Sequence, residues 1–371
     1  MKAISNTREK NIGIVTFLYT NYGALLQAYA LQRYLKNENV NVVNIYFKTN
    51  WHENAARVFN LYGTFKSKIS QLFFTLIRYR GLKNRKLRTD LFRNKYFNLS
   101  TTYRTIEDFV SRPPLFDIYI SGSDQVFNPH GDYRDVFYLN FDKGGSKKIA
   151  YSASFGINEF TDDVTRIVLP LVHDFDAISC REKDGADYLR DILGREVYWV
   201  VDPTFLLRAE EWDEICILPN LKSKYIFVYA LADEKSLIEI AKRIKKKTGF
   251  KIICVRGNTR DFISADKCIY GSGPAEFIGL IRNAEYVVTD SYHGTIFSII
   301  FNKAFYTFIS RPKVASRIYS LINLLQCSDR IITKDSFKSF TFDNEVAVPK
   351  IEQLEEMIKH SKMFISKEIL L

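Results

Sequence analysis

Short β-branched segments alternate with amphipathic helical segments along most of the chain, and this alternation limits its fold more than any other feature. The first unit reads NIGIVTF, then GALLQAYALQRYLK with apolar residues at helical spacing, then VNVVNIYF. Repeated strand–helix–strand order is typical of parallel sheets with helices on both faces. We therefore expect an α/β fold built from doubly wound parallel sheets.

The alternation runs in two series, which are separated by a polar segment that contains Pro219. A chain of 371 residues is long enough for two domains. We expect Rossmann-like domains over residues 1–215 and 216–345, and a helix over 346–371 that packs back across their junction. Such sheets bind ligands at the carboxyl ends of their strands, so we expect the domains to face each other across a cleft.

A basic segment interrupts the first series between residues of about 50 and 105. The chain has a net charge of +11, and much of the excess lies between Lys66 and Lys95, where Asp90 is the single acidic residue. SQLFFTLIRYR interleaves apolar and basic residues, as helices on a membrane surface do. Nucleic acid, a phosphorylated substrate or solvent are alternative partners for such a stretch. We expect a basic helical insertion in the first domain.

The expected compartment is the cytoplasm. The five cysteines are widely spaced and form no CxxC pair, which disfavours a disulfide framework and a zinc site. The first residues lack the apolar core of a signal peptide, and no run of about 18 apolar residues is present to span a bilayer. We expect a soluble or peripheral protein.

Five polar loops follow predicted strands, at the position where doubly wound sheets bind their ligands. The loops are YTNYG, SGSDQ, SASFG, SCRE and DSYHGT. Asn21 and Gly23 either open the first helix toward a ligand or serve only as turn formers. The loops supply these candidate substrate-binding residues: Asn21, Tyr22, Gly23, Ser121, Ser123, Gln125, Ser154, Ser291, Tyr292, Gly294 and Thr295.

His293 stands between a predicted strand, YVVTD, and a helix that begins near Gly294. A helix N-terminus favours an anion, Gly294 would let the backbone approach it, and Thr295 could add a hydroxyl. An imidazole at this point can donate to a phosphate or move a proton. A hydrogen-bonded histidine at a turn is the alternative, and the residue pattern alone favours neither.

Arg181 and Asp124 also follow predicted strands. A guanidinium at a sheet edge can hold a carboxylate or phosphate through two contacts, or it can pair with a nearby carboxylate such as Glu182. Asp124 is either the N-cap of a following helix or a carboxylate that acts on a substrate. We treat Asp202, in VVDPTFLL, as part of a structural turn.

Several common enzyme motifs are missing from the sequence. It contains no GxGxxG, Walker A, HExxH or GxSxG segment, and its five histidines have no metal-ligand spacing to cysteine. We therefore predict no metal site from the sequence, while dependence on a divalent metal stays open.

Taken together, the strand-end loops resemble the polysaccharide pyruvyl transferase family. The resemblance rests on the order of GIVTFLYTNYGALLQAYAL, FDIYISGSDQVFNP, YSASFG, SCREKDGADYL, VVDPTFLL and GPAEFIGLIRNAEYVVTDSYHGTIFSIIFNKAF. It implies two Rossmann-like domains similar to GT-B glycosyltransferases. It also implies an enzyme that moves the pyruvyl group of phosphoenolpyruvate (PEP) onto two hydroxyls of a sugar. The sugar would be a hexose such as galactose, the product a 4,6-ketal, and the acceptor a cell-surface polysaccharide or its lipid-linked precursor.

The resemblance places two residues at the donor site, and the chemistry of ketal formation suggests roles for His293 and Asp124. Arg181 and His293 fall on positions that handle PEP in the family, and His293 would donate or relay the proton and help phosphate leave. Asp124 would deprotonate or orient the acceptor hydroxyls. PEP would be the donor substrate, no cofactor would be required, and the acceptor saccharide would be carried on a polyprenyl diphosphate.

One position departs from the family pattern. Some relatives carry an arginine two residues before the histidine, where this chain has Ser291. A second cation for the donor would then come from elsewhere, for which Arg256 and Arg311 are the candidates from sequence.

Two other functions stay open. The same fold could carry a glycosyltransferase that uses a nucleotide sugar, or a non-catalytic protein that binds glycan or nucleic acid. With a lipid-linked acceptor, residues of about 66–95 would contact anionic lipid at the inner face of the cell membrane. We do not expect nucleic acid to be a partner.

Overall fold

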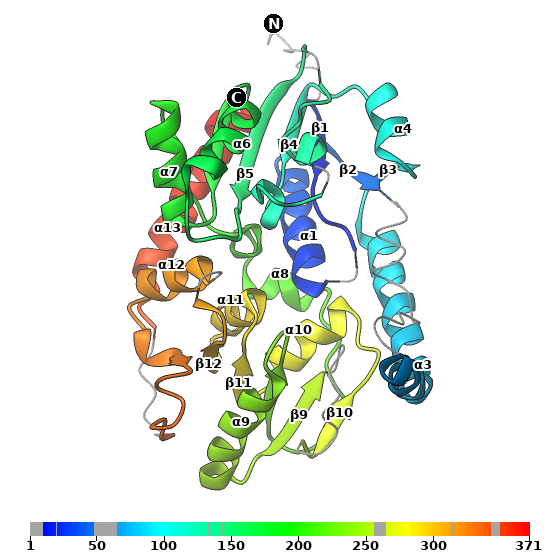
Figure 1. The fold of residues 1–371 in the computed structure, drawn as a ribbon, viewed down its shortest axis with the longest axis vertical. Helices are drawn as coiled ribbons and strands as arrows, with labels where there is room; N and C mark the ends of the chain where they lie inside the picture. The colour runs from blue at the N-terminus through cyan, green and yellow to red at the C-terminus, as the bar shows by residue number, and fades with distance from the viewer. Residues whose placement is uncertain are drawn as a thin grey trace, which may run out of the picture.

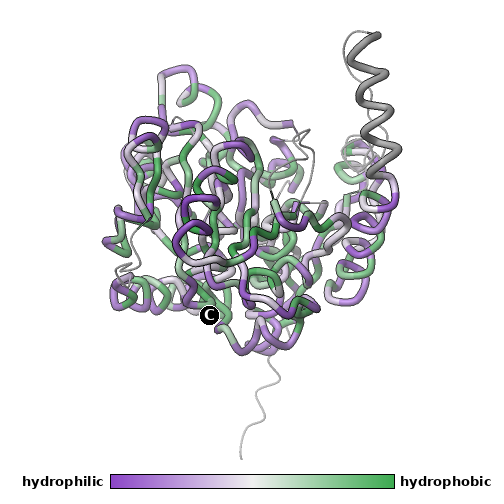
Figure 2. Tube along the Cα trace, turned by 90° about the horizontal axis from the view of Figure 1, so that it is seen from below, coloured by the Kyte–Doolittle hydropathy of each residue, from purple (hydrophilic) through white to green (hydrophobic). Residues whose placement is uncertain are grey.

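The computed structural model describes residues 10–19, 21–47, 65–132, 134–142, 144–255, 265–312, 315–342 and 349–371, without the side chains of 65–78. Two parallel sheets, each flanked by helices, lie one above the other along the long axis of the molecule (Figure 1). Figure 2 shows the hydrophobic stretches gathered in the interior and hydrophilic turns around the outside. The expected α/β fold of two doubly wound domains is confirmed.

The first sheet has seven parallel strands in the order β3-β2-β1-β4-β5-β6-β7. All four residues of β4 are buried, as expected for a sheet covered on both faces. The strands are β1 (Asn11–Val15), β2 (Asn41–Phe47), β3 (Leu99–Tyr103), β4 (Ile118–Ser121), β5 (Lys147–Ala153), β6 (Ala177–Cys180) and β7 (Tyr198–Trp199). The helices of this part are α1 (Tyr22–Asn37), α3 (Phe65–Tyr96), α4 (Ile106–Ser111), η1 (Gln125–Phe127), α5 (Arg134–Phe137), α6 (Asp162–Val172) and α7 (Lys183–Leu193).

The second sheet has six parallel strands in the order β10-β9-β8-β11-β12-β13. Numbered within the domain this order is 3-2-1-4-5-6, which is the order of a Rossmann sheet. The strands are β8 (Tyr225–Tyr229), β9 (Lys251–Val255), β10 (Lys267–Ile269), β11 (Tyr286–Thr289), β12 (Ala304–Ile309) and β13 (Ile331–Thr333). The helices are α9 (Glu234–Thr248), α10 (Pro274–Arg282), α11 (Tyr292–Ile300), α12 (Ser316–Leu324) and η4 (Ser328–Arg330).

The two sheets are joined through η2 (Pro203–Leu206) and α8 (Ala209–Asp213), and a continuous hydrophobic core crosses this junction. Trp212 of α8 is fully buried and its ring contacts both Tyr29 of α1 and Phe297 of α11. Helix α1 of the first domain therefore packs directly on the second.

The last helix of the chain returns to the first sheet (Figure 1). In α13 (Glu352–Ile365), the Phe364 ring lies 4.9 Å from the Tyr198 ring of β7, and the Ser361 hydroxyl accepts a hydrogen bond from the Val201 N–H at 2.9 Å. The segment η5 (Ser366–Leu370) continues along this domain, where the Leu370 carbonyl accepts from Lys10 at 2.8 Å. The final helix thus completes the cover of the first sheet.

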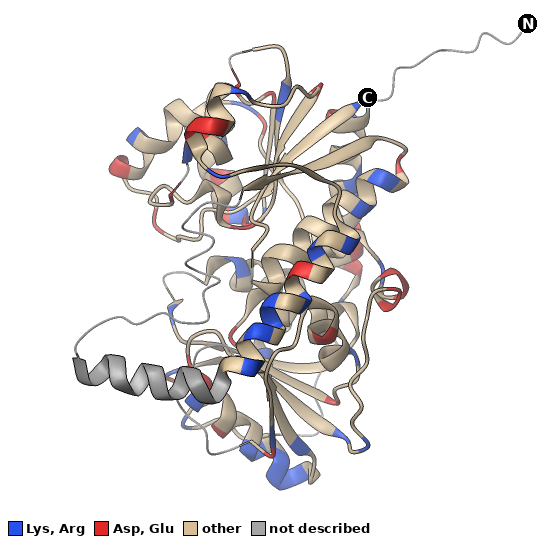
Figure 3. Cartoon of the chain, turned by 90° about the vertical axis from the view of Figure 1, so that its right-hand side faces the viewer, with Lys and Arg blue, Asp and Glu red and all other residues tan. Residues whose placement is uncertain are grey.

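Of the expected insertion at about 50–105, residues 50–64 lie outside the described residues, Phe65–Tyr96 form α3, and Leu99–Tyr103 are not helical but form strand β3 of the first sheet. The C-terminal half of α3 spans both domains (Figure 3). Arg93 donates to the Leu18 carbonyl of the first domain at 3.1 Å, and Arg88 donates to the Gly271 carbonyl of the second at 3.2 Å. Arg85 lies over the Tyr22 ring at 4.7 Å. Several basic residues of α3 therefore make contacts between the domains. Of the helices in the described ranges, none combines the length and the apolar character needed to cross a membrane.

Candidate functional site

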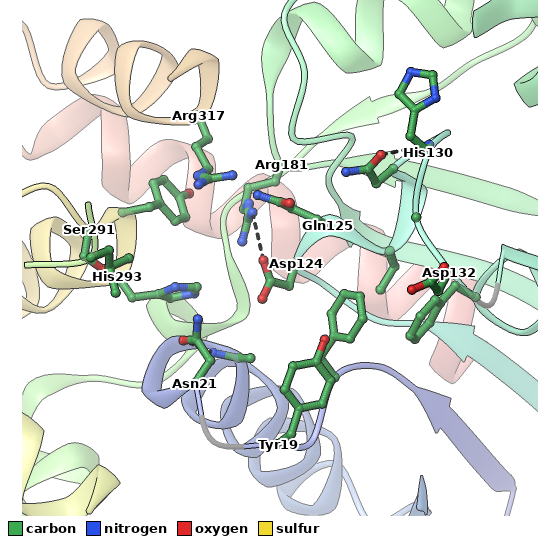
Figure 4. A pocket seen from close by; sticks show the side chains of 18 of the residues that line it. Tyr19, Asn21, Asp124, Gln125, His130, Asp132, Arg181, Ser291, His293 and Arg317 are labelled. Atoms are coloured by element: carbon green, nitrogen blue, oxygen red, sulfur yellow. Dashed lines mark hydrogen bonds and ion pairs between the residues drawn. The ribbon is translucent and has the colours of Figure 1, made fainter. Parts of the chain in front are cut away.

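A cavity of about 390 Å³ lies between the carboxyl ends of the two sheets (Figure 4). Strand order reverses between β1 and β4 in the first sheet and between β8 and β11 in the second. The loops after these four strands all contribute lining residues, among them Tyr19, Asp124, Leu231 and His293. Open α/β sheets bind their ligands at such reversal points, and the volume lies in the range of roughly 300–1,000 Å³ of small-molecule sites.

His293 is held in the first turn of α11, with its ring against the first helix of the other domain. The Ser291 side chain caps this helix by accepting a hydrogen bond from the Gly294 N–H at 3.3 Å. A Cβ atom added at Gly23 of α1 would lie 2.1 Å from His293 Nδ1. Gly23 is therefore required for the close approach of the two helices, and this approach fixes the imidazole.

Asp202 is the shared partner of His293 and Arg181. Its Oδ2 accepts from Arg181 Nη1 at 3.0 Å and lies 3.4 Å from His293 Nε2, and the Ser123 hydroxyl donates to the same oxygen at 3.4 Å. Its Oδ1 accepts from the N–H and hydroxyl of Thr204. Burial alone would raise the pKa of Asp202, but His293, Arg181 and the Thr204 hydrogen bond outweigh it and hold that pKa well below its ordinary value. Asp202 is therefore a fixed negative charge.

Arg181 is almost completely buried and is surrounded by carboxylates. Besides its bond to Asp202, Nη2 lies 3.5 Å from Asp124 Oδ1 and Nε lies 3.7 Å from Glu182 Oε1. The guanidinium also lies 4.6 Å from the centre of the Tyr292 ring. The structure shows the pairing alternative raised by the sequence, because Arg181 is paired with protein carboxylates; its guanidinium also lines the cavity.

Asp124 adopts a backbone conformation that is nearly restricted to glycine, with φ of 75° and ψ of −171°. Such a conformation costs about 1–3 kcal/mol, and it persists here because the Asp124 carbonyl accepts from the Ser154 and Val126 N–H groups. The Asp124 side chain makes no capping bond to η1. The carboxylate instead lies at the cavity next to Arg181 (Figure 4), which argues against the helix-cap alternative.

Four of the predicted substrate-binding residues line the cavity beside His293, Arg181 and Asp124. They are Asn21, Gln125, Ser291 and Tyr292. Asn21 is also the N-cap of α1, since its side-chain oxygen accepts from the Gly23 N–H at 2.9 Å. The turn-forming and ligand-facing alternatives for this loop are therefore compatible.

Other predicted residues do not line the cavity in the described structure, because their side chains serve the walls around it. The Tyr22 hydroxyl donates to the Ser272 carbonyl at 2.6 Å, and the Thr295 hydroxyl bonds the Thr307 hydroxyl at 2.7 Å. A Cβ at Gly294 would lie 2.6 Å from the side-chain oxygen of Thr289, so this glycine serves helix packing rather than anion approach. Ser154 donates to Glu182, Ser123 to Asp202, and Ser121 is buried in β4. Arg256 lies outside the described residues.

Sequence reasoning missed several cavity residues because they do not follow strands. His130 and Asp132 lie in the loop after η1, Arg134 begins α5, and Arg317 lies in α12. Asp202 was interpreted as structural, although its place just after β7 at a strand end was a signal for the site. Within the described part of the chain, no group of three His, Cys, Asp or Glu residues is arranged to hold a metal ion.

Comparison with known proteins gives one family match. The model of the polysaccharide pyruvyl transferase family matches residues 21–312, which include His293, Arg181 and Asp124. No curated protein matches the chain.

Two of the solved structures that are similar to this chain illustrate the shared fold. UGT89C1 of Arabidopsis thaliana in complex with UDP-L-rhamnose has 10% sequence identity and a TM-score of 0.54, covering 97% of this chain and 96% of its own. A UDP-N-acetylglucosamine 2-epimerase from Rickettsia bellii has 12% identity and a TM-score of 0.50, covering 98% of this chain and 99% of its own. These likenesses establish a GT-B-like arrangement of the two domains.

Proposed function

Because the chain belongs to the polysaccharide pyruvyl transferase family, we propose that it transfers the pyruvyl group of PEP to two hydroxyls of a sugar and releases phosphate. The observation that supports this most is that His293, Arg181 and Asp124, which follow three different strands, line one cavity. We propose a hexose such as galactose, modified as a 4,6-ketal, as the acceptor. It would belong to a cell-surface polysaccharide or to its precursor on a polyprenyl diphosphate.

The proposed reaction defines what the side chains must do. A proton is added to the methylene carbon of PEP, one sugar hydroxyl adds to the adjacent carbon, phosphate leaves, and the second hydroxyl closes the ketal. The two hydroxyls lose one proton each. In the overall balance, one of these protons ends on the new methyl carbon and the other on the released phosphate. The reaction therefore needs an acid and a base, and no cofactor besides PEP as substrate.

The cavity holds a candidate for each group, one from each domain. His293 lies on the second domain beside the ionised Asp202, and we assign it to proton transfer toward the methylene carbon and the leaving phosphate. Asp124 lies on the first domain with 19% of its side chain exposed, and we assign it to the acceptor hydroxyls. General acid–base groups of this kind contribute about 10²–10⁴-fold in rate.

The protein incubated with PEP and a panel of aryl and lipid-linked hexosides should release phosphate in step with a gain of one pyruvyl ketal in product mass. Asp124→Asn should lower turnover about 100-fold or more, because the amide cannot accept the hydroxyl proton. Asp163→Asn is the matched control, since Asp163 is a surface residue paired with Arg166. Full turnover by Asp124→Asn would remove Asp124 from the proposed mechanism.

Nucleotide-sugar transfer on the same fold is the alternative, since one protein of similar fold was solved with UDP-L-rhamnose. Thermal shift separates the two functions, because a ligand that binds the folded state raises the unfolding temperature. Stabilisation by PEP and not by UDP or UDP-sugars favours pyruvyl transfer. Salt-dependent oligonucleotide binding without PEP-dependent phosphate release would instead favour a non-catalytic binding protein.

We further propose that α3 places the protein at the inner face of the cell membrane. Lys83, Leu87, Leu91 and Lys95 follow one another at four-residue spacing, and both leucines are more than half exposed. Leucines flanked by lysines suit an anionic lipid surface.

Vesicles that contain anionic lipid should bind the wild type, and binding should weaken as salt is raised. The double variants Lys83→Gln/Lys95→Gln and Leu87→Ser/Leu91→Ser should bind several-fold less. Removal of two charges from α9 by Lys242→Gln/Lys246→Gln is the control. If vesicle binding is changed neither by salt nor by the α3 variants, the protein does not contact the membrane through this helix.

A further inference from the structure

Besides Arg181 and the exposed Arg134, the cavity is lined by Arg317, whose guanidinium the proposed roles leave unused (Figure 4). Arg317 is the second residue of α12, and it also lines a narrow pocket that adjoins the cavity. Its Nη1 is buried and makes no hydrogen bond within the described part of the chain. A cationic nitrogen that is buried without a hydrogen bond is costly, so an anion that accepts from Arg317 Nη1 would stabilise the protein.

Arg317 and Arg181 differ in how their charges are balanced. Arg181 forms ion pairs with Asp202, Asp124 and Glu182. Arg317 has no direct ion pair among the described residues. Burial and the like charge of Arg181 lower the pKa of Arg317, and they outweigh the longer-range attraction of Asp124 and Glu182. Arg181 is thus neutralised by the protein, whereas Arg317 keeps a positive charge that faces the cavity.

The structure holds Arg317 in place from both domains. Asn158, which follows β5 in the first domain, accepts from the Ser316 N–H at 3.2 Å and donates to the Pro312 carbonyl at 2.7 Å. The Tyr292 ring centre lies 5.9 Å from the Arg317 guanidinium and 4.6 Å from that of Arg181. One aromatic ring therefore spaces the two guanidinium groups along the same wall of the cavity.

We propose that Arg317 is the cation of this cavity that binds the anionic group of the donor substrate, a carboxylate or a phosphate. The identity of the donor as PEP rests on the proposed function, whereas the anion site rests on the geometry of Arg317 alone. Arg181 has a positioning role. It pairs with both Asp202 and Asp124, and it packs on the Tyr292 ring, which Arg317 also contacts.

Arg317→Gln and Arg317→Lys test this site, with Arg311→Gln as the control. Arg311 is exposed and is not among the residues that line the cavity, so its loss removes the same charge nearby. Calorimetry with PEP, inorganic phosphate and pyruvate should show PEP binding about 10- to 100-fold weaker in Arg317→Gln, partly restored in Arg317→Lys and unchanged in Arg311→Gln. If Arg317→Gln binds inorganic phosphate more weakly but pyruvate equally well, Arg317 binds the phosphate group of the donor. If it binds pyruvate more weakly but phosphate equally well, Arg317 binds the carboxylate.

A stability measurement separates binding from a structural role. Without ligand, Arg317→Gln should unfold at the same or a higher temperature than the wild type, because it removes a partly buried charge that has no direct ion pair and a buried nitrogen that has no hydrogen bond. A structural arginine would instead lower the unfolding temperature when replaced. Destabilisation of the ligand-free variant, or unchanged affinity for all three probes, would overturn the proposal.

The failures of the two proposals can be told apart. If the wild type binds PEP or phosphate through Arg317 but modifies no hexoside in the panel, the anion site stands and pyruvyl transfer fails. If the wild type forms the ketal and Arg317→Gln keeps its KM for PEP, pyruvyl transfer stands and the anion site fails.

Discussion

Asp202→Asn is expected to lower the free energy of unfolding by about 3–5 kcal/mol at neutral pH. The carboxylate is buried, bonds Arg181 at 3.0 Å and lies 3.4 Å from His293, so its neutralisation leaves two groups without their shared negative partner. Urea unfolding at pH 7 measures the change. Asp213→Asn is the control, because Asp213 pairs with Arg282 at the surface, where a salt bridge contributes about 0–1 kcal/mol.

The same variant has a pH signature with a defined sign. The folded-state pKa of Asp202 is below its ordinary value, so its contribution is complete above a pH of about 4 and is lost as pH falls further. The difference in the free energy of unfolding between the wild type and Asp202→Asn should therefore stay constant from pH 7 to about 5. This difference should become smaller below a pH of about 4. A gap that is small at pH 7, or that widens in acid, would contradict the charge network.

His293→Gln is expected to reduce kcat for PEP-dependent phosphate release about 10²–10⁴-fold. The glutamine side chain is similar in length to the histidine ring that lies against Gly23. It can still donate a hydrogen bond toward Asp202, but it cannot transfer a proton. The expected signature is therefore a fall in kcat that is much larger than any change in unfolding temperature.

His173→Gln is the matched control for this variant. His173 is exposed on the surface, where its ring contacts Asp174, and its loss should leave both rate and stability unchanged. Turnover by His293→Gln within a few-fold of the wild type would falsify proton transfer by His293.

The fold could be predicted because its signal is local. Buried β-branched strands such as β1 and β11 alternate with helices, and parallel sheets follow from that order alone. The same rule found His293, Arg181 and Asp124, because each of them comes shortly after the end of a parallel strand. A strand end places a residue at the sheet edge whatever the rest of the chain does.

The direction of each side chain could not be predicted in the same way. Tyr22 and His293 both occupy the first turn of a helix at the cavity, but Tyr22 turns into the core between the domains. Which residue of a first turn faces the ligand depends on the tilt of the helix, and packing between the domains sets that tilt. Asp202 and Arg317 were missed for a related reason, since the side chains that they contact come from distant segments of the chain.

The return of α13 to the first sheet has a consequence for synthesis on the ribosome. Phe364, Ile365 and Ile369 are buried against a domain whose strands are all translated by Trp199. The apolar surface around Tyr198 therefore stays uncovered while the whole second domain emerges. The first domain begins to fold first but is completed last, so a nascent chain stalled within the second domain would expose an aggregation-prone patch that chaperones could recognise.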